Sequence, residues 1–209
     1  MSAPAIYFVG DDALAIPAPA RATRHALAAA LRATGMWIDV VPGKGEVTVQ
    51  FDPLTLPPQA ARALLADQAA KAELAGEGAP RTLTFHMKTD EASAPDLARL
   101  AAENGLTPEA FLARICASPL VVDMMGFTAG FAYVVGVDAG LSAPRLDTPR
   151  QKVPAGSVGM LTGQLGFYAL AGAAGWPIIG QVTTRLFDAS RDAPFSLDAG
   201  MRIILAREA

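Results

Sequence analysis

The longest uncharged stretch of the chain limits the folds that it can adopt. Residues 153–184 contain no Asp, Glu, Lys or Arg, and they outnumber the roughly 20 residues that a membrane-spanning helix needs. However, the stretch reads VPAGSVGMLTGQLGFYALAGAAGWPIIGQVTT, with seven glycines and two prolines. Glycine and proline at this density favour turns and short strands over one continuous helix. We therefore expect a buried, glycine-rich β segment here and no association with a membrane.

The residues after Pro119 share this β character. Six strand-like runs are separated by glycine, proline and aspartate: VVDMM, FAYVVGV, SVGML, FYAL, PIIGQV and RIILA. Short strands at this spacing predict a closed or nearly closed β-barrel. Two short helices are expected before it, at 95–104 and 107–117. The second begins at Thr107-Pro108-Glu109, which supplies a capping residue, a proline at the first helical position and an early acid.

The first part of the chain alternates strand and helix signals. The pattern predicts a strand within 6–15, a helix at 20–34 ended by Gly35, a hairpin over 36–52, a second helix from 57 to 74, a linker at 76–80 and a strand at 81–87. This order is typical of a ferredoxin-like α/β sandwich with both helices on one face of the sheet. The expected fold class is therefore α+β, with a small α/β domain at 1–88 and a helical linker with a β-barrel domain at 89–209.

Composition and charge exclude several classes of protein. Hydrophobic residues make up 52% of the 209 residues and charged residues 18%, which excludes an intrinsically disordered chain. The 17 basic and 20 acidic residues give a net charge of −3, whereas nucleic-acid binders concentrate basic residues on one face. The single cysteine cannot form a disulfide within the chain, and no secretory signal is evident at the N-terminus. A cytoplasmic protein that binds no nucleic acid is expected.

Most isolated reactive residues are expected to be structural. His25 and His86, the only histidines, lie in separate elements and lack the spacing of a metal site, so no metal is expected. Cys116 lies near a helix C-terminus, where the helix dipole disfavours a thiolate. Ser157 lacks the first glycine of a nucleophile elbow, and Lys44 lies at a hairpin tip rather than in a phosphate-binding loop.

The strongest candidates for binding lie beside the uncharged stretch. Two Pro-Arg pairs, with Arg145 and Arg150, precede it, and Lys152 follows closely. A loop stiffened by proline that presents guanidinium groups beside a neutral pocket suits a carboxylate or phosphate, although solvated loop arginines would give the same pattern. Gln164 and Tyr168 offer neutral hydrogen bonds to an amide or carboxylate, with core or turn roles equally compatible with the pattern.

The same region resembles a known family. The stretch GFTAGFAYVVGVDAGLSAPRLDTPRQKVPAGSVGMLTGQLGFYAL, followed by GWPIIGQV and LFDASRD, is similar to the carboxyltransferase subdomain C/D family. That family includes the B subunit of 5-oxoprolinase, the sporulation kinase-inhibitor Kip protein, allophanate hydrolases of the subunit 1 type and part of urea carboxylase. The resemblance is strongest from about residue 95 to residue 206 and rests above all on the motif PRxxxPRxxVPAGSVG.

The resemblance implies a fold, partners and a reaction. The barrel would be cyclophilin-like, and the chain would assemble with a cyclophilin-like C-type partner and with an A-type partner of the oxoprolinase complex. Together they would open the lactam of 5-oxoproline to glutamate with ATP, so a small-molecule amide is the implied substrate and ATP the implied cofactor of the complex. The implied substrate-binding residues are Arg145, Arg150 and Gln164, with Tyr133, Tyr168 and Trp176 as walls of the pocket. The resemblance assigns no catalytic residue.

The chain departs from the family pattern at several positions. A His-Ser-Ser stretch of the family corresponds to Ile115, Cys116 and Ala117, which removes proton transfer and hydrogen bonding at the first position. Further departures are Ala129, Ala132 and Val135 in the run AGFAYVV, and Leu165 and Ala169 in the run GQLGFYA. Thr89, Asp90 and Glu91 depart from the pattern ahead of Pro95-Asp96-Leu97.

Three functions therefore remain open. The first is a 5-oxoprolinase subunit that is active only with its partners. The second is a non-catalytic regulator that binds a protein such as a histidine kinase, and the third is a diverged subunit related to allophanate or urea-amide chemistry. A prolyl isomerase would rest on fold analogy alone.

Overall fold

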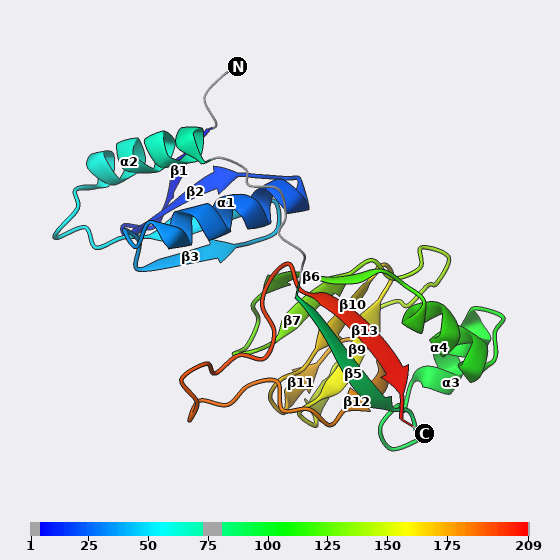
Figure 1. Cartoon of the computed structure of the whole chain (residues 1–209). Coiled ribbons are helices and arrows are strands. Elements are labelled where there is room, and N and C mark those ends of the chain that lie inside the picture. Colours follow the sequence, from blue (N-terminus) through cyan, green and yellow to red (C-terminus); the bar gives the residue numbers. More distant parts are fainter. Residues whose placement is uncertain (1–4, 73–80, 209) are drawn as a thin grey trace. The chain divides into compact units, whose positions relative to one another are not determined.

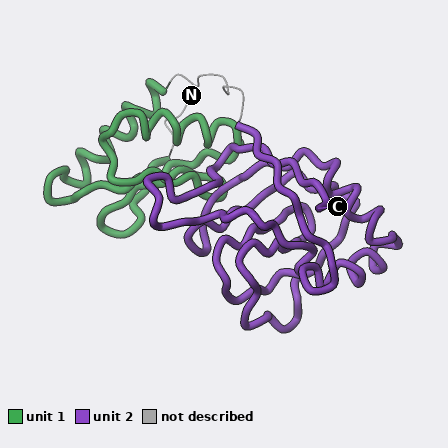
Figure 2. Tube along the Cα trace, turned by 60° about the horizontal axis from the view of Figure 1, so that its bottom comes forward, with its two compact units in different colours: residues 1–79 green, residues 80–209 purple. Residues whose placement is uncertain are grey.

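The chain forms two compact units in the computed structural model, which describes residues 5–72 and 81–208. Unit 1 spans residues 1–79 and unit 2 spans residues 80–209 (Figure 2). Each unit has its own hydrophobic core, and the two cores share no residue. The expected linker at 76–80 and the expected end of the second helix at residue 74 lie outside the described residues.

Unit 1 is an antiparallel sheet with two helices (Figure 1). Its elements are β1 (Tyr7–Val9), β2 (Ala13–Pro17), α1 (Arg21–Ala33), β3 (Asp39–Pro42), β4 (Glu46–Gln50) and α2 (Pro58–Lys71), and the strand order in the sheet is β1-β2-β4-β3. Val47 and Val49 of β4 are buried while the residues between and beside them are partly exposed, as expected for a strand with one covered face. Leu31 of α1 and Leu65 of α2 belong to the same core cluster, so both helices cover that face.

The expected helices and hairpin of unit 1 are confirmed, but the expected arrangement is wrong in two places. The segment 6–15 forms a hairpin, because Gly10 adopts φ 68° between β1 and β2, a conformation that favours glycine. The strand expected at 81–87 exists as β5 (Thr82–Lys88), but it pairs with strands of unit 2. The fourth strand of the unit 1 sheet is therefore β1, from the N-terminal end, and the division between the two units falls before β5 rather than at residue 88.

Unit 2 is a closed β-barrel with two helices and a small second sheet. Its elements after β5 are α3 (Leu97–Glu103), α4 (Pro108–Cys116), β6 (Leu120–Met125), β7 (Ala132–Val135), β8 (Arg150–Val153), β9 (Ser157–Leu161), β10 (Gln164–Phe167), β11 (Gly172–Ala174), β12 (Ile178–Val182) and β13 (Arg202–Arg207). The barrel order is β10-β7-β6-β13-β5-β12-β9, and β8 and β11 form a separate two-stranded sheet. The fold class is thus α+β, with the predicted barrel confirmed as closed.

The barrel interior is filled by alternate residues of its strands. Val134, Leu165 and Phe167 are fully buried in one cluster that also takes in residues of α3 and α4. The two predicted helices are confirmed, and the Thr107 hydroxyl accepts a hydrogen bond of 3.2 Å from the Ala110 N–H at the start of α4.

The uncharged stretch supplies most of one side of the barrel. Strands β9, β10 and β12 lie within it and are largely buried, as predicted, and glycines occur within and between them. Across the described ranges 5–72 and 81–208, no helix has both the length and the apolarity needed to cross a membrane.

Candidate functional site

Two glycines lie side by side on the outside of the barrel, one on β10 and one on β9. Gly166 of β10 lies opposite Tyr133 of β7 on one side and Gly159 of β9 on the other, and Gly159 lies opposite Ile178 of β12. Neighbouring residues on these strands point into the barrel core, so these positions face outward. A Cβ atom at Gly166 would lie 2.7 Å from the Phe131 ring and 2.9 Å from the Trp176 ring. The glycines therefore let aromatic rings pack directly on the strand backbone.

Aromatic side chains gather on this outer face. The Phe131 ring lies 4.8 Å from the Tyr133 ring and 4.9 Å from the Tyr168 ring, and the Tyr133 and Trp176 rings lie 5.9 Å apart, measured between centroids. The interplanar angles are 63–86°, so each pair meets edge to face, the arrangement that the ring quadrupole favours. The three aromatic residues expected to wall a pocket thus lie together, with Phe131 as a fourth member that sequence reasoning missed.

Arg145 lies next to this cluster. The Leu146 N–H donates a 3.0 Å hydrogen bond to the Gly175 carbonyl, which holds the loop that carries Arg145 beside Trp176. The guanidinium lies close over Gly175, because a Cβ atom there would be 3.2 Å from Arg145 Nη1. Arg145 is exposed, and within the described ranges its side chain forms no ion pair. The Arg145 guanidinium is therefore available to bind an anion at the edge of the aromatic cluster.

The Tyr168 phenol is tuned by this environment. Burial raises its pKa above the ordinary value, while the positive charge of Arg145 and a hydrogen bond from the backbone of Trp176 act in the opposite direction. The net effect keeps the hydroxyl protonated at neutral pH, so that it can donate a hydrogen bond.

Gln164 lies on the same outer face but farther along the strand. It begins β10 two residues before Gly166, pairs with Val135 and is partly buried. We refer to Tyr133, Gln164, Tyr168, Trp176 and the adjoining Arg145 as the aromatic face.

Arg150 is placed differently from the other candidates. Its Nη2 donates a 2.9 Å hydrogen bond to Oδ1 of Asp96, and its Nη1 lies 2.8 Å from Oδ2. The Asp96 carboxylate, which is only 5% exposed, also accepts a 2.6 Å hydrogen bond from the Ile178 N–H. The pair therefore joins β8 to the start of α3 and to β12. Asp96 was not predicted as a functional residue, since no local pattern indicated that it would meet an arginine 54 residues away.

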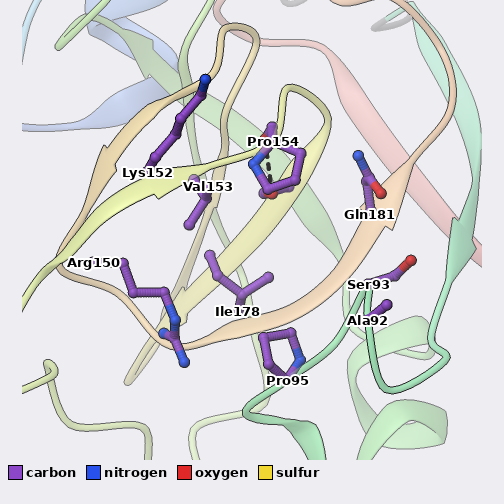
Figure 3. Close-up of a pocket in the computed structure, with 10 residues that line it drawn as sticks. Ala92, Ser93, Pro95, Arg150, Lys152, Val153, Pro154, Ile178 and Gln181 are labelled. Atoms are coloured by element: carbon purple, nitrogen blue, oxygen red, sulfur yellow. Dashed lines mark hydrogen bonds between the residues drawn. The ribbon is translucent and has the colours of Figure 1, made fainter.

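A cavity of about 200 Å³ lies beside this ion pair (Figure 3). It is lined by Ala92, Ser93, Pro95, Arg150, Lys152, Val153, Pro154, Ser157, Ile178 and Gln181. In Figure 3 the β8 residues stand on one side, Ser93 and Gln181 on the other, and Ile178 between them. Val153 and Ile178 also belong to the hydrophobic cluster under the aromatic face, so the cavity and the aromatic face adjoin each other. We call it the β8–β12 cavity.

The residues that were expected to be structural occupy ordinary positions. Ser157 is buried, and its hydroxyl donates a 2.8 Å hydrogen bond to the Pro154 carbonyl. Cys116 ends α4, and burial raises the pKa of its thiol, which disfavours a nucleophilic thiolate. Two positions that depart from the family pattern, Ile115 and Leu165, are fully buried in the barrel core. Leu165 therefore faces away from the outer side on which Gln164 and Gly166 lie.

The family model for the carboxyltransferase domain, subdomain C and D, matches residues 4–197. The chain belongs to this family. The B subunit of 5-oxoprolinase from Escherichia coli O157:H7 is 41% identical over 109 residues, which are 52% of this chain and 50% of that protein. The matched part thus spans only about half the length of the relative.

Solved structures extend the likeness to nearly the whole chain. The crystal structure of TTHA0988 matches with a TM-score of 0.80 and 26% identity, over 95% of this chain and 40% of that one. The urea carboxylase of Kluyveromyces lactis matches with a TM-score of 0.72 and 12% identity, over 98% of this chain and 22% of that one. At that identity the second likeness is one of fold alone.

Proposed function

We propose that the chain is the B-type component of a 5-oxoprolinase-like amidohydrolase and acts with C-type and A-type partners. The family membership and the similarity to the B subunit of 5-oxoprolinase support this function. The observation that carries it is the aromatic face, where flat rings adjoin one exposed guanidinium. A small lactam that bears a carboxylate, such as 5-oxoproline, has matching chemistry.

Each group of the aromatic face has a role in this proposal. Tyr133, which is partly exposed, would pack against the flat lactam ring with the buried Trp176 behind it, and Arg145 would bind the carboxylate through two parallel hydrogen bonds. Tyr168, kept protonated by burial, would donate to the lactam carbonyl oxygen, and Gln164 would bind the amide from the same side. These groups bind and orient; a nucleophile with an adjacent base is not among them. We therefore assign the face to substrate binding and leave the bond-breaking steps to the assembled complex.

ATP would supply the phosphoryl group that activates the lactam carbonyl before water attacks. The β8–β12 cavity does not fit ATP, since its volume of about 200 Å³ is below the roughly 300–1,000 Å³ of pockets that hold drug-sized ligands.

The role of Arg150 in this proposal differs from that of Arg145. With its guanidinium paired to Asp96, Arg150 would support the architecture beside the aromatic face rather than grip the substrate. Its replacement would therefore mix a loss of fold with a loss of binding, which makes Arg145 the better residue for a test.

The test is reconstitution of the complex. The chain is co-expressed with homologues of the A-type and C-type partners, the complex is purified, and glutamate formed from 5-oxoproline is measured with and without ATP. We expect ATP-dependent glutamate formation that falls on the order of a hundredfold in Arg145→Ala, as expected for the loss of a charge-assisted bidentate contact. Arg62→Ala is the matched control, because Arg62 is an exposed arginine on α2 of unit 1. A complex that assembles and releases no glutamate would refute the proposal, and turnover of allophanate instead would identify a diverged subunit.

The second candidate is a regulator that binds a partner protein. Phe127 favours it: the side chain is 66% exposed, its ring lies 5.3 Å from that of Phe131 at the border of the aromatic face, and its backbone adopts φ 64°, which is uncommon for a residue other than glycine. Failure to assemble with the A-type and C-type homologues, together with capture of a histidine kinase that is lost in Phe127→Ser, would favour this role.

A further inference from the structure

The β8–β12 cavity holds hydrogen-bond donors that the fold leaves unused. Arg150 has five N–H groups, and its contacts to Asp96 engage two of them. Nη1 is fully buried against that carboxylate without a well-aligned hydrogen bond and is closed to a ligand, whereas Nε has no hydrogen-bond partner among the residues that the structure describes. Because Asp96 and the Ile178 N–H hold the guanidinium in place, these donors are oriented before any ligand arrives.

A second cation lies on the same strand. Lys152 follows Arg150 by two residues on β8, is exposed, and has no ion pair to any residue that the structure describes. In Figure 3 its side chain extends away from the Arg150 guanidinium, so the two charges stand at different ends of the cavity wall. The Asp96 carboxylate offsets one positive charge, which leaves the wall with a net positive charge.

The acidic group on the loop opposite is already engaged. A hydrogen bond from the Ser93 side chain, together with hydrogen bonds of 3.1 Å from the Ser93 and Ala92 N–H groups, lowers the pKa of the Asp90 carboxyl and ties its charge to this loop. Ser93 itself lines the cavity. Gln181 donates from Nε2 to the Ala155 carbonyl at 2.8 Å, which fixes the amide and leaves Oε1 as an acceptor.

The volume limits what can enter. About 200 Å³ corresponds to the share of roughly seven water molecules, at about 30 Å³ each in the liquid. A molecule no larger than an amino acid fits this space. Pro95, Val153, Pro154 and Ile178 supply an apolar wall that would exclude water from around the ligand.

We propose that the β8–β12 cavity is a binding site for a small anion that carries a carboxylate or phosphate group, held by Arg150 and Lys152. The site is separate from the aromatic face and does not depend on the function proposed for it. Carboxylate and phosphate share the oxygen geometry that a guanidinium binds through parallel N–H groups, so the chemistry admits both.

Calorimetric titration of the full chain tests this proposal with sodium phosphate and with sodium glutarate, against sodium chloride at equal ionic strength. We expect saturable binding of at least one of the two anions. Saturation by phosphate alone, by glutarate alone or by both would each support the site and would identify the ligand class. The absence of saturable binding to both would overturn the proposal.

Three variants show whether the binding belongs to this cavity. Lys152→Met should weaken the affinity on the order of tenfold, since a hydrogen bond to a charged group is lost. Lys44→Met is the matched control, because Lys44 is a lysine at the tip of the β3–β4 hairpin in unit 1. The titrations are repeated in Arg145→Ala, which removes the carboxylate contact proposed for the aromatic face, so that saturable binding left in that variant belongs to the cavity. An equal loss in the two lysine variants, or no loss in Lys152→Met, would contradict the assignment.

Discussion

At the scale of single residues, the glycines under the aromatic face are the most demanding positions. Gly166→Ala would bring a Cβ atom within 3 Å of the Phe131 and Trp176 rings, and both rings would have to move. Overpacking of this kind costs about 1–3 kcal/mol of the free energy of unfolding. We expect a lower denaturation midpoint and a changed near-ultraviolet circular dichroism signal from the aromatic residues.

Gly172→Ala is the control for that substitution. Gly172 also lies in a strand of unit 2, but a Cβ atom there would meet nothing within 4 Å. The change should shift the free energy of unfolding by less than about 0.5 kcal/mol. Equal losses of unfolding free energy in Gly166→Ala and Gly172→Ala would show that the rings do not pack on Gly166.

Tyr168 gives the molecule a predictable response to alkaline pH. Burial raises the pKa of its phenol above 10.0, so the folded state holds the proton more tightly than the unfolded state does. The resulting stability is fully present below the unfolded pKa of about 10 and is lost as the pH rises through the folded value. As the pH rises through about 10 and above, the free energy of unfolding of the native chain should therefore fall more steeply than that of Tyr168→Phe. Parallel curves for the two proteins would contradict this account.

At the scale of elements, the Asp96–Arg150 pair joins three of them. Asp96→Asn keeps the size of the side chain and removes the charge that faces the Arg150 guanidinium. Because Asp96 is buried while Arg150 is about one-third exposed, we expect a loss of about 2 kcal/mol in the free energy of unfolding, below the cost of breaking a fully buried pair. Urea denaturation monitored through Trp176 fluorescence would measure it.

An exposed ion pair of α3, between Glu103 and Arg99, provides the comparison. Arg99 also lies 3.7 Å from Asp96, and Glu103→Gln leaves that contact in place. Glu103 binds Arg99 at 2.6 Å, but both side chains are more than 40% exposed. Exposed pairs contribute little because water and salt screen them, so Glu103→Gln should cost less than about 0.5 kcal/mol. A cost for Asp96→Asn as small as this would mean that the buried pair does not hold β8 in place.

Elements could be predicted from the sequence where their signals are local. The N-cap of α4, the glycine after α1 and the β3–β4 hairpin depend on residues a few positions apart, and all three are confirmed. The partner of β5 could not be predicted, because the alternation in RTLTFHM indicates a strand without indicating its neighbour. That neighbour is β13, where Phe85 lies opposite Leu205.

The candidate site, like the strand pairing of β5, could be predicted only in part from the sequence. Tyr133, Tyr168 and Trp176 were predicted as walls of one pocket from the family resemblance. Their rings lie together around Phe131, and the pocket itself stays a prediction. Arg150 was predicted to bind a carboxylate or phosphate, or else to be a solvated loop arginine, because its adjacent proline and the uncharged stretch are visible in the sequence. Its pairing with Asp96 is a consequence of the barrel topology, which brings β8, α3 and β12 together.

At the scale of the whole molecule, the two cores imply two separate folding units. Leu65 is fully buried in the core of unit 1 and belongs to no cluster of unit 2. The chain has two tryptophans, Trp37 in unit 1 and Trp176 in unit 2. Each tryptophan therefore reports on one unit when the other is replaced by phenylalanine.

Leu65→Ala uses this arrangement to test the independence of the units. The lost side chain leaves a cavity in the unit 1 core and should cost that unit about 2–4 kcal/mol. In a Trp176→Phe background, the unfolding midpoint reported by Trp37 should fall. In a Trp37→Phe background, Leu65→Ala should leave the unfolding midpoint reported by Trp176 unchanged. Equal shifts of the two midpoints would instead mean that the units unfold as one cooperative body, and that the barrel draws stability from the α/β unit that precedes it in the chain.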